Sequence, residues 1–187
     1  MIKICDSKRL SYRLFDLSNT ENCKQDIQDM WHLEQDPDVM KYITKGITTS
    51  KEVMEKVFVP RIKSYTYPEQ GYGMWRVSIK HTDEFIGEII ARPMGFFTNT
   101  PNFDDIELGW RFYKAHWGRG YATESALHVM HYIENKNQVN YFTAMADSDN
   151  ASSIYVMKKL GMMFIKNTTH SDPLGDAKVD IYQRKIN

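Results

Sequence analysis

The sequence has no excess of charge of either sign, only two cysteines and no long hydrophobic run. Lysine and arginine together number 24, as do aspartate and glutamate, so the formal net charge is zero. This balance argues against a broad nucleic-acid-binding surface. No apolar segment approaches the ~20 residues of a membrane span, and the N-terminal MIKICDSKRL lacks the hydrophobic stretch of a signal peptide. We therefore expect a cytoplasmic protein that binds neither nucleic acid nor membranes.

Cysteine usage and the lack of linkers limit the possible organisation of the chain. The spacing of Cys5 and Cys23 fits neither a CxxC motif nor a disulfide framework, so two reduced thiols are expected. There is no repeat, no low-complexity tract and no segment rich in Gly, Ser or Pro. The composition, 42% hydrophobic and 26% charged residues, is that of an ordinary globular protein. One domain over residues 1–187 is the simplest organisation.

The N-terminal third is expected to contain one strand followed by helices. Residues 10–17 have the pattern of a strand, and residues 23–65 have a helical pattern with two interruptions. Ser50 is a plausible N-cap for the last of these helices, because its hydroxyl can accept a hydrogen bond from the first turn. Pro60 is expected to kink or end that helix, because proline has no backbone N–H group.

The rest of the chain alternates between strand and helix patterns. The expected segments are strands over 74–80 and 85–91, a loop over 92–104, a strand over 105–113, a helix from Ala122, a strand over 139–146, a short helix from Asn150 to Gly161, and strands over 162–166 and 178–184. The strand–helix–strand order within 105–146 predicts a parallel pair with a right-handed crossover. The whole pattern predicts an α/β arrangement with a mixed sheet.

The stretch HWGRGYATES, residues 116–125, follows a strand and opens a helix. Ligands bind at such places in α/β proteins, because unpaired backbone N–H groups and the helix dipole favour an anion. Gly118 and Gly120 leave the backbone unobstructed, and Arg119 can pair with a phosphate. A Rossmann loop would need a glycine where Thr123 stands, and a Walker loop would need Lys followed by Ser or Thr. Neither pattern is present.

Two motifs resemble those of the GNAT superfamily of acyl-CoA-dependent N-acetyltransferases. The family's pyrophosphate loop, Q/R-x-x-G-x-G/A, is similar to residues 117–122, with Gly120 and Ala122 at the small positions. Downstream, NASSIYVMKKLGM at 150–162 resembles the family segment N-x-x-[AS]-x-x-x-x-x-K-L-G-[FM]. Trp117 stands in place of the usual Gln or Arg, and in this the loop resembles the RimJ/RimL-type branch, the ribosomal-protein N-terminal acetyltransferases and their relatives.

The resemblance is clearest over residues 74–166 and implies both a fold and an acyl donor. The implied fold is α/β (α+β), with a central, mostly antiparallel twisted sheet of about six to seven strands, flanking helices and a splayed parallel pair. Acetyl-CoA would be the donor, and no metal is implied, because the helix N-terminus supplies positive potential. The residues implied in donor binding are Trp110, Arg111, Phe112, Trp117, Gly118, Arg119, Gly120, Tyr121, Ala122, Thr123, Asn150 and Ser153.

Acetyl transfer to an amine also requires two proton transfers. The attacking amine must lose a proton, and its pKa is ~10.4 for a lysine-type amine and ~7.7–8.0 for an α-amine. Glu107 stands where many GNAT enzymes carry a general base, and Glu88 on the preceding strand is the alternative. The tyrosine that many GNAT enzymes use to protonate the thiolate is replaced by Met157. Ser153 is the candidate donor, and solvent is the alternative, because a thiol has a pKa of ~8.5.

A metal site is not expected on the helix that follows the loop. Glu124, His128 and His131 share one helical face, and such spacing can hold a metal. This face lies opposite the apolar stripe, however, so we expect it to be solvated.

The acceptor pocket is expected between the helices of residues 23–65, including Trp31 and Tyr42, and the aromatic loop 93–104. The resemblance implies a protein or peptide N-terminal α-amine as acceptor, with a small-molecule amine or amino acid as the alternative. A non-catalytic acyl-CoA-binding sensor or a nucleotide-binding protein would have a similar glycine loop. The resemblance implies a monomer or a homodimer.

Overall fold

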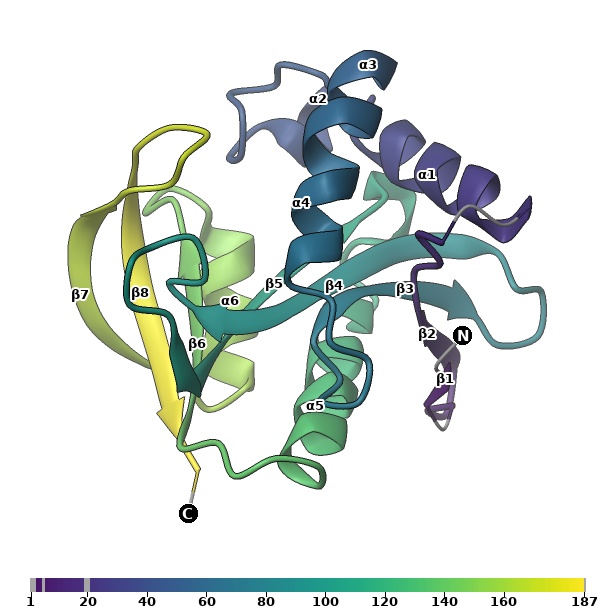
Figure 1. The fold of residues 1–187 in the computed structure, drawn as a ribbon. Helices are drawn as coiled ribbons and strands as arrows, with labels where there is room; N and C mark the ends of the chain where they lie inside the picture. The colour runs from purple at the N-terminus through teal and green to yellow at the C-terminus, as the bar shows by residue number, and fades with distance from the viewer. Residues whose placement is uncertain (1–2, 5, 19–20, 187) are drawn as a thin grey trace.

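The computed structural model of the protein describes residues 3–4, 6–18 and 21–186. One sheet has the strand order β1-β2-β3-β4-β5-β6-β8-β7, and only β5 and β6 run parallel (Figure 1). The strands are β1 (Lys3–Ile4), β2 (Leu10–Leu14), β3 (Gly73–Ile79), β4 (Phe85–Met94), β5 (Asn102–Phe112), β6 (Tyr141–Ala146), β7 (Met163–His170) and β8 (Ala177–Lys185). Cys23 is buried, whereas Cys5 lies outside the described residues.

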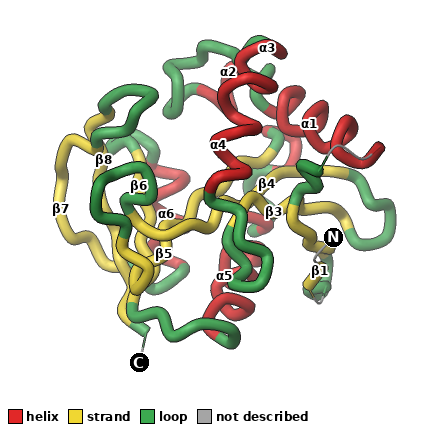
Figure 2. The backbone as a smooth tube through the Cα atoms, viewed as in Figure 1, coloured by secondary structure: helices red, strands yellow, loops and turns green. Residues whose placement is uncertain are grey.

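Helices cover both faces of the sheet (Figure 1, Figure 2). Those from α1 to α4 lie on one face, and α5 and α6 lie on the other. The helices are α1 (Glu21–Leu33), α2 (Pro37–Met40), α3 (Lys51–Val53), the π-helix η1 (Met54–Phe58), α4 (Val59–Ser64), the 3-10 helix η2 (Lys114–His116), α5 (Tyr121–Glu134) and α6 (Ala151–Lys159). Within the described residues, no helix combines the length and the apolar character that crossing a membrane requires.

The central strands supply hydrophobic side chains to both faces of the sheet. Trp75 and Ile89 are fully buried in a core that includes Val129 of α5. Met74, next to Trp75 on β3, packs instead in a second core with Ile62 of α4. Successive residues of a strand point to opposite faces, so burial on both faces fixes the register of these strands.

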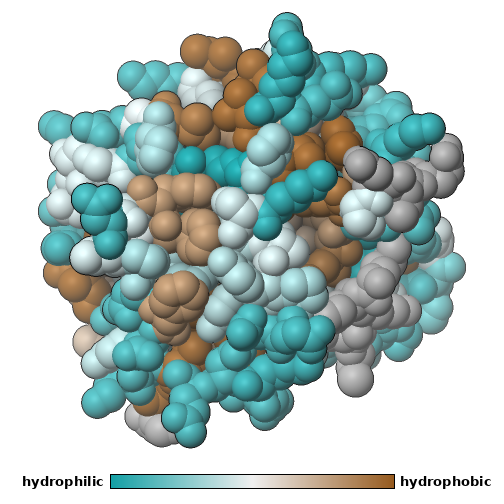
Figure 3. Space-filling view, viewed as in Figure 1, coloured by the Kyte–Doolittle hydropathy of each residue, from teal (hydrophilic) through white to brown (hydrophobic). Residues whose placement is uncertain are grey.

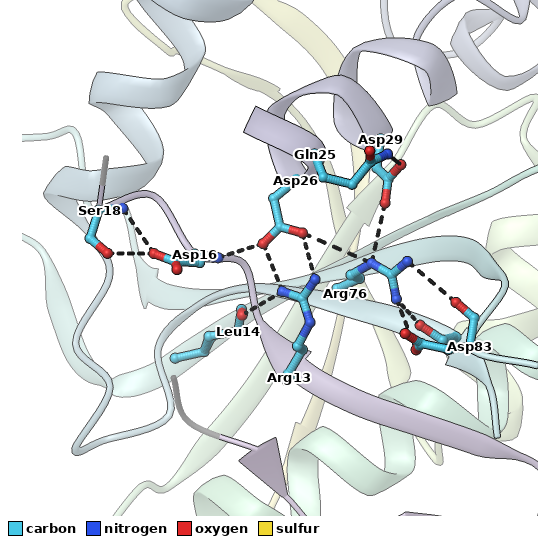
Figure 4. A network of polar contacts seen from close by, with 10 residues as sticks. Arg13, Leu14, Asp16, Ser18, Gln25, Asp26, Asp29, Arg76 and Asp83 are labelled. Atoms are coloured by element: carbon cyan, nitrogen blue, oxygen red, sulfur yellow. Dashed lines mark hydrogen bonds and ion pairs between the residues drawn. The ribbon is translucent and has the colours of Figure 1, made fainter. Parts of the chain in front are cut away.

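Charged contacts also hold α1 on the sheet (Figure 4). Arg13 of β2 donates to the two oxygens of Asp26 at 2.7 and 2.5 Å, and Asp26 is fully buried. Arg76 of β3 lies 3.3 Å from Asp29, one turn further along α1. Pairing each buried carboxylate with a guanidinium offsets the cost of removing both from water. The C-terminal end of α1, next to Glu34, therefore has a fixed place on the sheet.

The predicted fold class is confirmed: the sheet is mixed and mostly antiparallel, has one parallel pair and is flanked by helices. Ser50 caps α3 as predicted, accepting a hydrogen bond from the Val53 N–H at 3.2 Å. Pro60 does not end the helix, which continues to Ser64. The π-helix before it shifts the hydrogen-bond register, so Pro60 falls in the first turn of α4, where its missing N–H is tolerated.

The predicted loop over 92–104 is wrong at both ends. Strand β4 extends to Met94 and β5 begins at Asn102, so the connection is confined to residues 95–101. Pro93 obscured the strand pattern, because proline is uncommon within sheets. It is accommodated beside an irregularity in the β4–β5 register between Pro93 and Met94. The correction places Arg92 inside the sheet, directly across from Glu107.

Candidate active site

Strands β5 and β6 are paired over only three residues each, 105–107 with 141–143. Further along, residues 108–112 pair only with β4, and residues 144–146 pair only with β8. The two facing edges therefore present backbone N–H and C=O groups that no strand satisfies. A linear ligand with amide groups suits such an opening, because it can supply the missing hydrogen bonds.

The glycine loop lies at the open end of this gap, between β5 and α5. Gly118 and Gly120 have φ angles of 72° and 79°, a region that favours glycine. A side chain built at Gly118 meets no atom within 4 Å, so the space outside the loop is open. Gly120 is the N-cap of α5 and offers no side-chain cap, which leaves the first helical N–H groups available to an anion. Trp117 donates its indole N–H to the Phe112 carbonyl at 2.7 Å and ties the loop to β5.

Arg9, which belongs to no sequence motif, fastens this loop from the start of β2. Its guanidinium donates to the Arg119 carbonyl at 3.0 Å and to Glu124 at 2.7 Å. The same group lies 4.5 Å from the centre of the Tyr121 ring. Arg119 itself is exposed beside the open space. Arg9 therefore holds the loop in shape and leaves the Arg119 side chain available to a ligand.

The helical face of Glu124, His128 and His131 is not fully solvated, so that expectation is wrong. Glu124 accepts a hydrogen bond from Ser7 at 2.6 Å, and His128 stacks on Tyr12 with ring centroids 4.6 Å apart. Burial alone would raise the pKa of Glu124. The hydrogen bonds from Ser7 and Arg9 outweigh this effect and hold the pKa below its usual range. Within the described part of the chain, His, Cys, Asp and Glu side chains form no group of three able to hold a metal.

Glu107 lies on the sheet face covered by α4, at the point where β5 and β6 separate. The Arg92 guanidinium donates to both of its carboxylate oxygens, at 2.9 and 2.8 Å. The Glu107 side chain is 11% exposed. The loop aromatics Phe96 and Phe97 pack against Tyr65. Phe96 and Phe97 also line a small cavity together with Glu107. The predicted base is therefore oriented by a guanidinium and enclosed by aromatic rings.

A second carboxylate, Asp105, lies at the closed end of the gap. It accepts hydrogen bonds from the Thr143 hydroxyl at 2.8 and 2.9 Å and from the Gln183 amide at 2.9 Å. Burial raises the pKa of Asp105, and the negative charge of Glu107 adds to the rise. This network joins β5, β6 and β8, and so fixes the place at which the gap begins.

The Arg111 backbone groups face β4 and not the gap, because Tyr113 donates its N–H to Ile86 of β4 and alternate residues of a strand bond to the same side. The Arg111 side chain belongs to a buried ionic cluster. It contacts Glu34, which follows α1, and lies 2.6 Å from Glu88 of β4. One guanidinium serves two carboxylates here, and in the described structure Oε2 of each carboxylate has no hydrogen-bond partner. Burial raises the pKa of Glu88 to about 7, although Arg111 opposes the rise. Glu88 can therefore exchange a proton near neutral pH, but it is only 2% exposed.

The predicted helix after β6 begins as expected at Asn150. Its Oδ1 accepts hydrogen bonds from the Ser153 N–H at 3.1 Å and the Ser152 hydroxyl at 3.0 Å. Ser153 is half-buried in the first turn, whereas Met157 is buried and Tyr155 is 60% exposed. Because β6 leads directly into α6, this first turn lies at the open end of the gap.

The remaining predicted residues divide between the core and the surface. The side chains of Trp110 and Phe112 pack in the core beside α5, so these residues border the gap through their backbone. Trp31, predicted at the acceptor pocket, lines a separate groove between α1 and α3. Tyr42 lies beside the Lys41 ammonium. Of the expected aromatic walls, the loop after β4 is the one that reaches Glu107.

The chain is similar to known proteins in sequence and in fold. The family of the acetyltransferase (GNAT) domain matches this chain over residues 21–163. The uncharacterized protein YkkB of Bacillus subtilis (strain 168) is 32% identical over 155 residues, 82% of each chain. The uncharacterized N-acetyltransferase YnaD of the same organism is 28% identical over 156 residues, 83% of this chain and 80% of its own. A solved structure of RimL, the ribosomal L7/L12 alpha-N-protein acetyltransferase, in complex with coenzyme A has a TM-score of 0.73 at 16% identity, covering 99% of this chain and 98% of that one.

Proposed function

Because the chain belongs to the acetyltransferase (GNAT) domain family and is an acetyl-CoA-dependent acyltransferase, we propose that it acetylates the N-terminal α-amine of a protein or peptide. The amine attacks the thioester directly while both substrates are bound. The gap between β5 and β6 beside the glycine loop supports the donor site, and the fold shared with the RimL alpha-N-protein acetyltransferase supports an α-amine as the acceptor. We also infer that residues 1–187 form one catalytic domain of the RimJ/RimL-type branch, as a monomer or a homodimer.

The donor site fits coenzyme A in two places. Backbone N–H groups of residues 118–123, at the N-terminus of α5, suit the pyrophosphate, and the space at Gly118 is open to receive it. The unpaired edges of 108–112 and 144–146 suit the two amides of the pantetheine chain. Asn150 and the first turn of α6 flank the same opening. Acetyl-CoA held there supplies an acyl group already activated as a thioester.

Glu107 is the proposed proton acceptor for the amine. It lies where β5 and β6 separate, on the face opposite the core that contains α5. An ionised carboxylate has about four lone-pair sites, and Arg92 occupies two of them, so about two remain for the amine or a bridging water. Glu88 is the alternative, because its pKa of about 7 suits a base at neutral pH.

Ser153 is the proposed proton donor to the departing thiolate. Its hydroxyl lies in the first turn of α6, and Asn150 fixes the backbone of that turn. Solvent is the alternative donor, because a thiol with a pKa of ~8.5 is readily protonated at neutral pH.

Two measurements test the proposal. Acetyl-CoA at near-millimolar concentration should raise the melting temperature, whereas ATP and NAD should not. Thiol release should then occur with peptides that have a free N-terminus and not with N-acetylated copies of them. No stabilisation by acetyl-CoA would sink the proposal. Stabilisation without turnover on any amine, with Glu107→Gln behaving like the wild type, would indicate an acyl-CoA sensor, and turnover of small amines alone would replace the peptide acceptor.

A further inference from the structure

Above Glu107, a continuous series of contacts links three segments that are distant in sequence. Asp172, in the β7–β8 loop, is paired with Arg61 of α4. The Arg61 guanidinium lies 3.4 Å from the ring centre of Phe97, in the β4–β5 loop. The Arg92 guanidinium, which holds Glu107, lies 5.3 Å from the same ring. Phe97 therefore lies close to two guanidiniums, each of which is paired with a carboxylate, Asp172 or Glu107.

This series of contacts narrows the space in front of Glu107. The cavity is lined by Arg92, residues 95–98, Glu107 and residues 170–172, and its volume is about 10 Å³. One water molecule needs about that much room. Figure 3, which looks onto the side of α4, shows hydrophobic side chains gathered in patches on this face between hydrophilic ones. A cavity of this size cannot hold an acceptor, so an acceptor that approaches Glu107 from this side must displace one of the loops.

Moving the β7–β8 loop leaves one charge without a partner. The charged groups at the cavity and above it are Arg61, Arg92, Glu107 and Asp172, and His170 is a further titratable side chain in the lining. The side chains of Arg61 and Asp172 are only 14% and 16% exposed. Withdrawal of Asp172 would leave the largely buried Arg61 without its carboxylate partner, which is costly. An acceptor that brings its own carboxylate removes this cost.

We propose that Arg61, stacked on Phe97, is a subsite for a carboxylate of the acceptor, and that Asp172 occupies this subsite until the acceptor arrives. The acceptor class is then an amine that carries a carboxylate, either an acidic amino acid or a peptide with an acidic residue near its N-terminus. A guanidinium suits this role because it binds a carboxylate through two parallel hydrogen bonds. The first test of this inference measures turnover and so rests on the proposed acetyltransferase function. The second test measures only binding and does not depend on that function.

The catalytic readout compares acceptors that differ only in one charge. The first pair is free glutamate and free glutamine. The second pair is a tetrapeptide with glutamate at its second position and the same peptide with glutamine there. Comparing the pairs shows whether the carboxylate comes from an amino acid or from a peptide. The wild type should prefer the carboxylate in at least one pair by about ten-fold or more in kcat/KM. Arg61→Gln should abolish the preference. Lys63→Gln, which removes an exposed positive charge from the same helix, should leave it intact.

Asp172→Asn distinguishes the subsite from a merely structural ion pair. The asparagine side chain of this variant would keep the loop bond that Oδ1 of Asp172 accepts from the Leu174 N–H at 2.9 Å, but it would compete less well for Arg61. The affinity for carboxylate acceptors should therefore rise in Asp172→Asn and fall in Arg61→Gln. Misfolding cannot produce the gain. Equal use of carboxylate and amide acceptors by the wild type, or an equal loss for both in Arg61→Gln, would overturn the proposal.

The binding readout needs no turnover. N-acetylglutamate should raise the melting temperature of the wild type more than N-acetylglutamine does. The difference should be larger in Asp172→Asn and absent in Arg61→Gln. If no amine is acetylated but this pattern is found, the proposed function fails and the subsite stands. If amines are acetylated but the two compounds act alike in all three proteins, the subsite fails and the function stands.

Discussion

Arg92 and Glu107 face each other across β4 and β5, and the Arg92 guanidinium holds both carboxylate oxygens of Glu107, at 2.9 and 2.8 Å. The pair is nearly enclosed, with each side chain 11% exposed. A catalytic carboxylate held in this way needs little reorganisation before it accepts a proton. Removing either side chain would leave the other charge buried without a partner, which would destabilise the fold.

The first prediction concerns Glu107→Gln. The amide oxygen of glutamine can still accept a hydrogen bond from Arg92, but it cannot take a proton from the amine. We expect kcat/KM to fall by about 10²–10⁴-fold, the usual contribution of a general base, while acetyl-CoA affinity stays unchanged. Thiol-release kinetics and calorimetric titration measure the two quantities. Glu69→Gln, at an exposed position, is the control, and activity equal to that control would transfer the role to Glu88.

The second prediction is a pH dependence of stability that arises from Glu88. Its pKa is about 7 in the folded protein against a usual value of 4.5, because it is buried. Between these values the unfolded chain releases a proton that the folded chain retains, so stability falls as pH rises from 4.5 to about 7. The loss is on the order of 3 kcal/mol, since one pKa unit corresponds to ~1.4 kcal/mol.

Glu88→Gln should remove this loss, because glutamine stays neutral and leaves Arg111 paired with Glu34. The variant should be more stable than the wild type above pH 7, and its free energy of unfolding should change less between pH 5 and 8. Urea titrations at several pH values measure both effects, with Glu69→Gln as control. An unchanged pH slope would mean that Glu88 stays ionised in the folded protein.

The third prediction concerns the glycine loop. Alanine at Gly118 must adopt a φ of 72°, which costs roughly 1–2 kcal/mol, and its methyl group would project into the open space of the proposed pyrophosphate site. We expect both lower stability and weaker acetyl-CoA binding. Gly46→Ala is a matched control, because Gly46 has a φ of 81° and room for a methyl group. It should lose similar stability and keep its affinity, and equal affinity in both variants would contradict the site.

The fourth prediction separates two roles of Asn150. Asn150→Ala should cost about 1 kcal/mol of stability through loss of the N-cap of α6, and it should also weaken acetyl-CoA binding. Asn150→Asp restores the cap but removes the amide N–H₂ donor, so stability should recover and affinity should not. Thermal unfolding with and without acetyl-CoA measures both. Recovery of affinity in Asn150→Asp would show that Asn150 acts only as a cap.

The features that could be predicted from the sequence are set by neighbouring residues. The glycine loop, the cap at Asn150 and the crossover from β5 to β6 each depend on a short segment, and the structure contains all three. Arg9 could not be found in this way, because it reaches the Arg119 carbonyl across 110 residues of chain.

The roles of Arg92 and Arg61 could not be predicted from the sequence for a similar reason. Arg92 faces Glu107 only because the β4–β5 register brings the two together, and Pro93 made this part of β4 look like a loop. Arg61 meets Asp172 through the packing of α4 against a loop 111 residues away. Neither relationship has a local pattern, because strand register and loop packing are decided by the whole fold.

The gap between β5 and β6 has a consequence for the order in which substrates bind. Each strand is held along its outer edge by a neighbour, β4 or β8, so the gap stays open without a ligand. Entry of the donor breaks no hydrogen bond between strands, whereas an acceptor that binds at the proposed carboxylate subsite displaces Asp172 from Arg61. We therefore expect an ordered sequential mechanism with acetyl-CoA first, in which coenzyme A inhibits competitively against acetyl-CoA and non-competitively against the amine.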